Sequence, residues 1–145
     1  MFTATQNEQE RLRYWRNFRR NFPEDGTELD VVEAFADIKV CSRYIDYYTP
    51  ADWPGVFDIV SNGYFCQTGI TLVMTATLHN LGFIITDKLH FSMVSNNITG
   101  CDGAVLVYNN KCYNFLPGEI VAVDYAVKNS VRFSSAIITP DKLFG

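Results

Sequence analysis

The residue whose type and position best fit a nucleophile is Cys66, which follows an Asn62-Gly63 turn and begins a long uncharged segment. The spacing predicts a helix from Cys66 to about Leu81, ended by Gly82 in left-handed geometry. Free backbone N–H groups and the positive end of the helix dipole stabilise a thiolate at such a position. A cysteine nucleophile also needs a histidine to accept its proton and a carboxylate or amide to orient that histidine. Without those partners, a cysteine at a helix start is a structural residue.

The chain contains two histidines, and their predicted positions differ. His79 lies on the same predicted helix as Cys66, about 20 Å further along the axis, so the two side chains cannot meet. His90 lies on a predicted strand, where alternation places it on the face opposite Leu89 and Phe91 and favours a solvent-exposed position. His90 is therefore the candidate proton acceptor if the chain is an enzyme.

Other site chemistries lack their residues in this sequence. The cysteines are Cys41, Cys66, Cys101 and Cys112; they form no Cys-x-x-Cys pair, and two histidines do not complete a zinc site. No glycine-rich loop carries the lysine of a phosphate site, and isolated aspartates offer no carboxylate pair for glycosidase chemistry. We therefore expect no metal and no cofactor. Apolar neighbours predict that Cys41, Cys101 and Cys112 are small core residues.

The composition predicts one soluble globular unit. The chain has 145 residues, 48% of them hydrophobic, and a formal net charge of -4. These values exclude a disordered polymer and disfavour a protein that coats nucleic acid. Residues 1–21 lack the apolar run of an export signal, and the apolar stretch at 70–85 is shorter than the about 20 residues of a membrane span. We expect reduced thiols, no membrane span and a cytoplasmic location.

The segment from Asn7 to Phe22 is predicted to be an amphipathic helix with one strongly basic side. Five arginines against two glutamates give it a charge of +3, which leaves -7 for the rest of the chain. The simplest expectation is a helix docked through its apolar stripe, and the alternative is a positive surface that meets an acidic partner, nucleic acid or a membrane surface. We divide the chain into this helix, residues 1–22, and a body, residues 23–145. The candidate partner-binding residues are Arg13, Trp15, Arg16, Arg19 and Arg20.

The order of the predicted elements indicates an α+β fold, because helices fill the first half and the strand period follows. A helix is predicted over Asp30 to Tyr44, and a loop with a short helix over Ala51 to Ser61. The mainly antiparallel sheet is predicted from strands beginning at Leu89, then Ala104 to Tyr108, Lys111 to Phe115, Ile120 to Val127 and Arg132 to Thr139, with a hairpin turn at Asn109-Asn110.

This order resembles the transglutaminase-like (papain-like) cysteine peptidase domain. The resemblance rests on the Trp53 loop, on Asn62-Gly63-Tyr64-Phe65-Cys66, on Leu81-Gly82-Phe83 and on the sheet that follows. It covers about Asp30 to Phe115. The chain also resembles small uncharacterised bacteriophage proteins with a Trp-Pro loop before such a helix.

Carried over residue by residue, the resemblance implies a degenerate site. Cys66 matches the nucleophile, and Asn114 falls where the orienting acid is expected. The strand Gly103-Ala104-Val105-Leu106-Val107 matches the family's histidine strand, but Gly103 stands in the histidine position. Phe65 replaces the acidic residue that precedes the nucleophile. A glycine cannot accept a proton, so the resemblance implies that the fold is kept without the chemistry.

Three functions follow as hypotheses. The first is a non-catalytic binding or accessory protein with a protein partner, acting in bacteriophage–host interaction (in the host cytoplasm) or as a minor virion component. The second is an active cysteine hydrolase or acyltransferase on peptide or amide bonds, in which Cys66 attacks, His90 is the base and Asn114 orients it. The third is a nucleic-acid binder that uses the arginine-rich helix. The sequence leaves the oligomeric state open.

Overall fold

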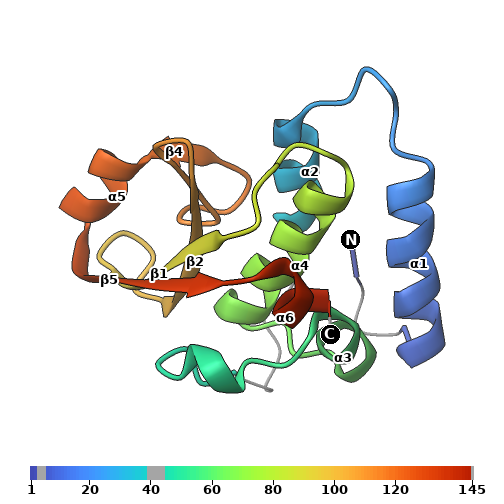
Figure 1. Cartoon of the computed structure of the whole chain (residues 1–145), viewed down its shortest axis with the longest axis horizontal. Coiled ribbons are helices and arrows are strands. Elements are labelled where there is room, and N and C mark those ends of the chain that lie inside the picture. Colours follow the sequence, from blue (N-terminus) through green and yellow to red (C-terminus); the bar gives the residue numbers. More distant parts are fainter. Residues whose placement is uncertain (3–5, 39–44, 145) are drawn as a thin grey trace.

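The computed structural model describes residues 1–2, 6–38 and 45–144, and it has the predicted α+β organisation (Figure 1). Helices fill the first half of the chain, and a five-stranded antiparallel sheet of order β4-β3-β2-β1-β5 fills the second. The helical half comprises α1 (Glu8–Arg20), α2 (Glu28–Phe35), the 3-10 turn η1 (Pro50–Asp52), α3 (Val56–Asn62) and α4 (Gln67–Asn80). The second half comprises β1 (Leu89–Asn96), β2 (Asp102–Tyr108), β3 (Lys111–Tyr113), β4 (Ile120–Ala122), α5 (Val123–Lys128), β5 (Ser130–Ile138) and α6 (Pro140–Phe144).

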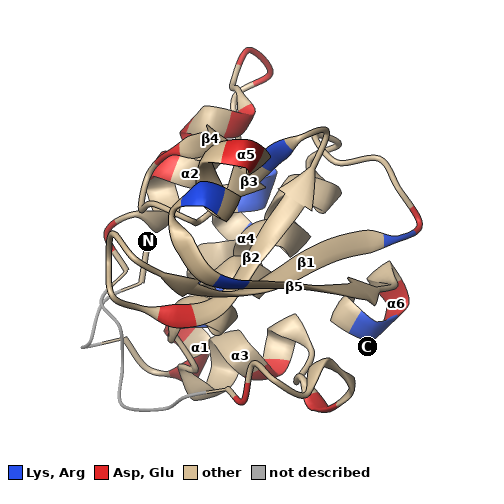
Figure 2. Ribbon diagram, turned by 90° about the vertical axis from the view of Figure 1, so that its left-hand side faces the viewer, with Lys and Arg blue, Asp and Glu red and all other residues tan. Residues whose placement is uncertain are grey.

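Helix α4 is the centre of the core, as its uncharged sequence predicts. It is buried without interruption from Thr68 to Leu78, and it packs across β2 (Figure 2). Thr71, Thr75 and Thr77 tolerate burial because their hydroxyls donate to carbonyl oxygens one turn earlier, as Thr75 does to the Thr71 carbonyl at 2.7 Å. Gly82 follows the helix with a φ of +84°, which confirms the predicted left-handed stop.

Helix α1 is docked on α3 and α4 by a buried aromatic ring and a half-buried cation. The Trp15 side chain has no exposed surface, and its indole Nε1 donates to the Thr77 hydroxyl at 2.9 Å. The Arg11 guanidinium donates to the carbonyl oxygens of Val60 at 2.8 Å and Ser61 at 2.5 Å, near the end of α3. A cation that binds the last carbonyls of a helix also stabilises the negative end of its dipole. Helix α1 therefore shares one core with α3 and α4.

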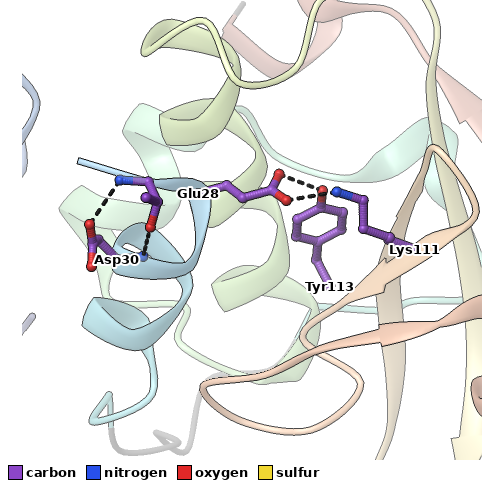
Figure 3. A network of polar contacts seen from close by, with 5 residues as sticks. Glu28, Asp30, Lys111 and Tyr113 are labelled. Atoms are coloured by element: carbon purple, nitrogen blue, oxygen red, sulfur yellow. Dashed lines mark hydrogen bonds and ion pairs between the residues drawn. The ribbon is translucent and has the colours of Figure 1, made fainter. Parts of the chain in front are cut away.

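A polar network joins α2 to the sheet (Figure 3). Glu28 accepts a hydrogen bond from Lys111 at 2.7 Å and another from the Tyr113 hydroxyl at 2.8 Å. Burial alone would raise the pKa of Glu28, but the hydrogen bonds from Lys111 and Tyr113 outweigh it and hold that pKa below its usual value. On the same helix, Thr27 and Asp30 form a reciprocal capping box, which fixes where α2 begins.

The hairpin prediction is confirmed. Asn109 and Asn110 have φ values of +51° and +60° and connect β2 to β3, which is the left-handed pair that a two-residue hairpin turn requires.

Several sequence predictions about individual segments are wrong. The strand predicted over Ile120 to Val127 is a three-residue strand followed by helix α5, because only Ala126 of the later residues is buried and the pattern there is helical. The predicted helix over Asp30 to Tyr44 ends at Phe35 in α2, with residues 39–44 outside the described part of the chain. The C-terminal helix α6 was not predicted.

The cysteine predictions have mixed outcomes. Cys112 is buried, as expected. Cys101 is exposed, because it precedes β2 in the turn between strands rather than lying in the sheet. Cys41 lies outside the described residues.

Candidate functional site

Cys66 is the residue that caps α4. It has extended backbone angles, and its Sγ accepts hydrogen bonds from the backbone N–H of Gly69 at 3.4 Å and of Ile45 at 3.3 Å. The residue is 4% exposed. The sequence prediction of its place is therefore confirmed, and the sulfur takes the role that a serine or aspartate oxygen often takes at a helix start.

Gly69 fixes the approach to Cys66 because the backbone leaves no room for a side chain there. A Cβ at this position would lie 1.7 Å from the carbonyl oxygen of Tyr64. The first turn of α4 thus packs directly against the backbone of the segment that precedes Cys66. Only glycine permits that contact.

A pocket of about 640 Å³ lies in front of Cys66. Its described lining includes Tyr47, Cys101 and Asp102 beside the first turn of α4. Burial, together with a hydrogen bond to Tyr48 and the nearby Asp102 charge, raises the pKa of Tyr47 above its usual value. The Tyr47 phenol therefore stays protonated at neutral pH and is a poor base. No histidine is among the described lining residues.

Gly103 lies against the start of α4, at the position where the resemblance implies a histidine. A Cβ added to Gly103 would lie 2.6 Å from Cγ of Gln67 and 3.3 Å from the Thr68 hydroxyl. The Gln67 side chain continues past Gly103 and donates its Nε2 hydrogen to the Asn114 carbonyl oxygen at 2.5 Å. Gln67 therefore fills the space that a larger residue 103 would need.

Asn114 is brought to the same end of α4, as the resemblance implies. It is 6% exposed, and its Nδ2 donates to the Thr71 hydroxyl at 2.8 Å. Its φ of +68° lies in the left-handed region that asparagine tolerates. The Asn114 amide thus holds the segment after β3 against α4. Gln67, the residue after Cys66, adds a second link between this segment and the start of α4 through its hydrogen bond to the Asn114 carbonyl.

The structure does not bring a histidine to the start of α4. His90 is exposed and pairs with Val107 on β2, whereas Gly103 pairs with Val94, four residues further along β1. Four residues of strand span about 13 Å. His79 is on the last turn of α4, with its ring 5.9 Å from that of Phe144. The two histidines of the chain are therefore both remote from the start of α4.

The predicted partner-binding residues divide into two groups. Arg13, Arg16 and Arg20 are exposed, and Arg19 is half-buried with its guanidinium 4.0 Å above the Trp15 ring. The prediction that Trp15 contacts a partner is wrong, since its side chain lies wholly inside the core. Its place in the apolar stripe of α1 is the physical reason.

Sequence reasoning missed two residues that matter for these surfaces. Gln67 follows the candidate nucleophile directly, but nothing in the sequence shows that its side chain would pack on Gly103. Phe57 is 47% exposed beside the arginines of α1, with its ring 5.3 Å from that of Trp15. The sequence shows that Phe57 is an aromatic residue in a short predicted helix, but it does not show which residues surround it in space.

Within residues 1–2, 6–38 and 45–144, no group of three His, Cys, Asp or Glu side chains is placed to hold a metal ion. In the same part of the chain, no helix has the length and apolar character needed to cross a bilayer.

The helices and the five-stranded antiparallel sheet, with Cys66 at the start of buried α4, have the transglutaminase-like α+β fold. A solved structure that shares this fold is LapG of Legionella pneumophila (EGTA-treated), a transglutaminase-like cysteine protease fold. The two superpose with a TM-score of 0.62 at 13% sequence identity, over 90% of this chain and 74% of that one. No model of a known protein family matches the chain, and no curated protein matches it.

Proposed function

We propose that this chain is a non-catalytic binding protein built on the transglutaminase-like fold. One observation carries the proposal. The position on β2 that faces the start of α4 is Gly103, and the Gln67 side chain packs against it. Gln67 is held there by its hydrogen bond to the Asn114 carbonyl.

The groups around the Cys66 sulfur support this proposal. A thiol becomes an effective nucleophile when a neighbouring base takes its proton. Among the described residues that line the pocket, the charged ones are Asp46 and Asp102. No histidine is among these described lining residues to take the proton of Cys66. The Cys66 sulfur instead accepts two backbone hydrogen bonds, which gives it a structural role at the helix start.

The exposed arginines of α1 are the proposed contact surface. Arg13, Arg16 and Arg20 are exposed on a helix that Arg11 joins to α3 and Trp15 joins to α4. A protein partner fits this surface better than nucleic acid does, because the whole chain has a net charge of -4 and would be repelled by a long run of phosphates.

The direct test is turnover of an activated ester. The purified protein and a Cys66→Ala variant are incubated with p-nitrophenyl acetate, and p-nitrophenol release is followed well beyond one equivalent. The proposal predicts equal steady-state rates for the two proteins, with at most a stoichiometric acylation of exposed Cys101. Sustained release that disappears in Cys66→Ala would overturn the proposal, because it requires both attack by Cys66 and deacylation.

A further inference from the structure

A groove of about 350 Å³ runs along the surface between α1 and α3. Arg13, Arg16 and Arg19 line it, together with Leu12 and Phe57. The three arginines follow one another at intervals of three residues, so they share one side of the helix over about 9 Å of its axis. We call this feature the arginine groove.

No carboxylate among the described residues forms an ion pair with an arginine of the groove. The ion pair that the described residues form joins Lys111 to Glu28, on a different part of the molecule. Burial, and to a lesser extent the neighbouring positive charge of Arg16, lowers the pKa of Arg19. An anionic group placed between the guanidinium groups would offset that positive charge.

The floor of the arginine groove is apolar. Phe57 is 47% exposed, although its ring also contacts that of Trp15. Leu12 is half-buried beside it. An exposed aromatic ring surrounded by cations offers an anchoring contact to a partner side chain, as aromatic and arginine residues do at the centres of protein interfaces.

The arginine groove is preformed. Trp15 is completely buried under it, and Arg11 bonds the last carbonyls of α3. These contacts fix the spacing of α1 and α3 before any partner binds, so association loses little conformational entropy in the backbone.

We propose that the arginine groove binds an acidic segment of a partner protein, in which carboxylates flank one apolar side chain. Carboxylates pair with guanidinium groups through two parallel hydrogen bonds, and the apolar side chain covers Phe57. A long polyanion fits less well, because Glu8 and Glu10 precede the arginines on α1 and exposed Asp58 follows Phe57 on α3. This inference rests on the proposed binding function, and it names the surface and the class of partner.

The test is a titration of the ¹⁵N-labelled protein with the peptide Glu-Glu-Phe-Glu-Glu, followed by NMR. We expect saturable shifts confined to the amides of α1 and α3. The groove variant Arg16→Glu, which reverses one charge in the arginine groove, should bind at least about tenfold more weakly. Arg20→Glu is the matched control, with an equivalent charge change at an exposed position of α1 outside the groove, and it should change the affinity less than about twofold. Replacing the peptide phenylalanine by glycine should also weaken binding.

Three results would overturn the inference: no saturable shifts, equal losses in the groove variant and in Arg20→Glu, or tighter binding of a single-stranded oligonucleotide that carries four phosphates. Cys66→Ala should leave peptide binding unchanged. Failure of this titration leaves the ester test for Cys66 untouched, so the two proposals fail separately.

Discussion

The start of α4 and the arginine groove differ in how their polar groups are satisfied. At the start of α4, the Cys66 sulfur, the Gln67 amide and the Asn114 amide all have hydrogen-bond partners within the protein. In the arginine groove, the guanidinium groups have no carboxylate partner among the described residues. Groups that are satisfied internally maintain the architecture, whereas charges left without counterions are available to a partner. This difference supports our proposal that a partner binds at α1 and α3 rather than at Cys66.

The largest expected loss of stability at the start of α4 comes from Gly69→Ala. Alanine normally stabilises a helix relative to glycine, but here its Cβ would lie 1.7 Å from the Tyr64 carbonyl oxygen. We expect the free energy of unfolding to fall by more than about 4 kcal/mol, or folding to fail. Urea denaturation followed by circular dichroism measures the change.

Gly100→Ala is the matched control for that variant. Gly100 has a φ of +72° and open space around it, so the substitution should cost only about 1 kcal/mol of left-handed strain. If the free energy of unfolding falls by similar amounts in the two variants, then Gly69 does not approach the Tyr64 carbonyl closely in solution, which would contradict this account.

The second region depends on the buried ring beneath it. Trp15→Ala removes a side chain with no exposed surface and its hydrogen bond to Thr77, so the free energy of unfolding should fall by about 3 kcal/mol or more. Trp15→Phe keeps most of the volume and should lose less than half as much. A loss below about 1 kcal/mol for Trp15→Ala would mean that α1 is not docked on the body. Thermal unfolding of the three proteins tests this.

Arg11→Ala sharpens the contrast between arginines on one helix. Arg11 bonds the carbonyl oxygens of Val60 and Ser61, and loss of these charged hydrogen bonds should lower the free energy of unfolding by about 1.5 to 3 kcal/mol. Arg20→Ala removes an exposed arginine and should stay within about 0.5 kcal/mol of the parent protein. Denaturant titration compares them, and equal effects would contradict the division of α1 into a docked and a free side.

The smallest predicted effect is a pH dependence outside both regions. The hydrogen bonds of Glu28 with Lys111 and Tyr113 hold its pKa below the unfolded value of about 4.3. The folded state therefore binds fewer protons, so this stabilisation is complete above the unfolded pKa and is lost as the pH falls through the folded pKa. The difference in unfolding free energy between the parent protein and Glu28→Gln should be largest near neutrality and should shrink near pH 3. A difference that stays constant over that range would remove Glu28 from the acid response.

Most of the architecture is predictable from the sequence. Uniform burial of α4 follows from a segment without charges, and the Asn109-Asn110 turn follows from the left-handed tolerance of asparagine. Exposure of His90 follows from strand alternation. The failure at α5 has a physical reason, because the valines and tyrosine of that segment favour strands locally, whereas the fold turns them outward on a short helix.

The site is less predictable than the fold. The sequence places Cys66 at a helix start, and the resemblance places Gly103 and Asn114 near it. Neither shows that Gln67 packs on Gly103, since that contact depends on how β2 approaches α4. The arginine groove likewise depends on Phe57, which reaches the arginines only through the packing of α3 on α1.

The most direct test of the central claim is the alkylation rate of each cysteine at pH 6. The protein is treated with iodoacetamide, and peptides that contain Cys66, Cys101 and Cys112 are quantified by mass spectrometry. Burial raises the pKa of Cys112 to about 12, so Cys112 is the unreactive reference, and exposed Cys101 is the reactive one. The non-catalytic account predicts that Cys66 reacts at least about tenfold more slowly than Cys101, because its sulfur is buried and both histidines of the chain are remote from it. A Cys66 rate about a hundredfold above that of Cys101, lost in His90→Ala, would contradict the account and establish an activated nucleophile.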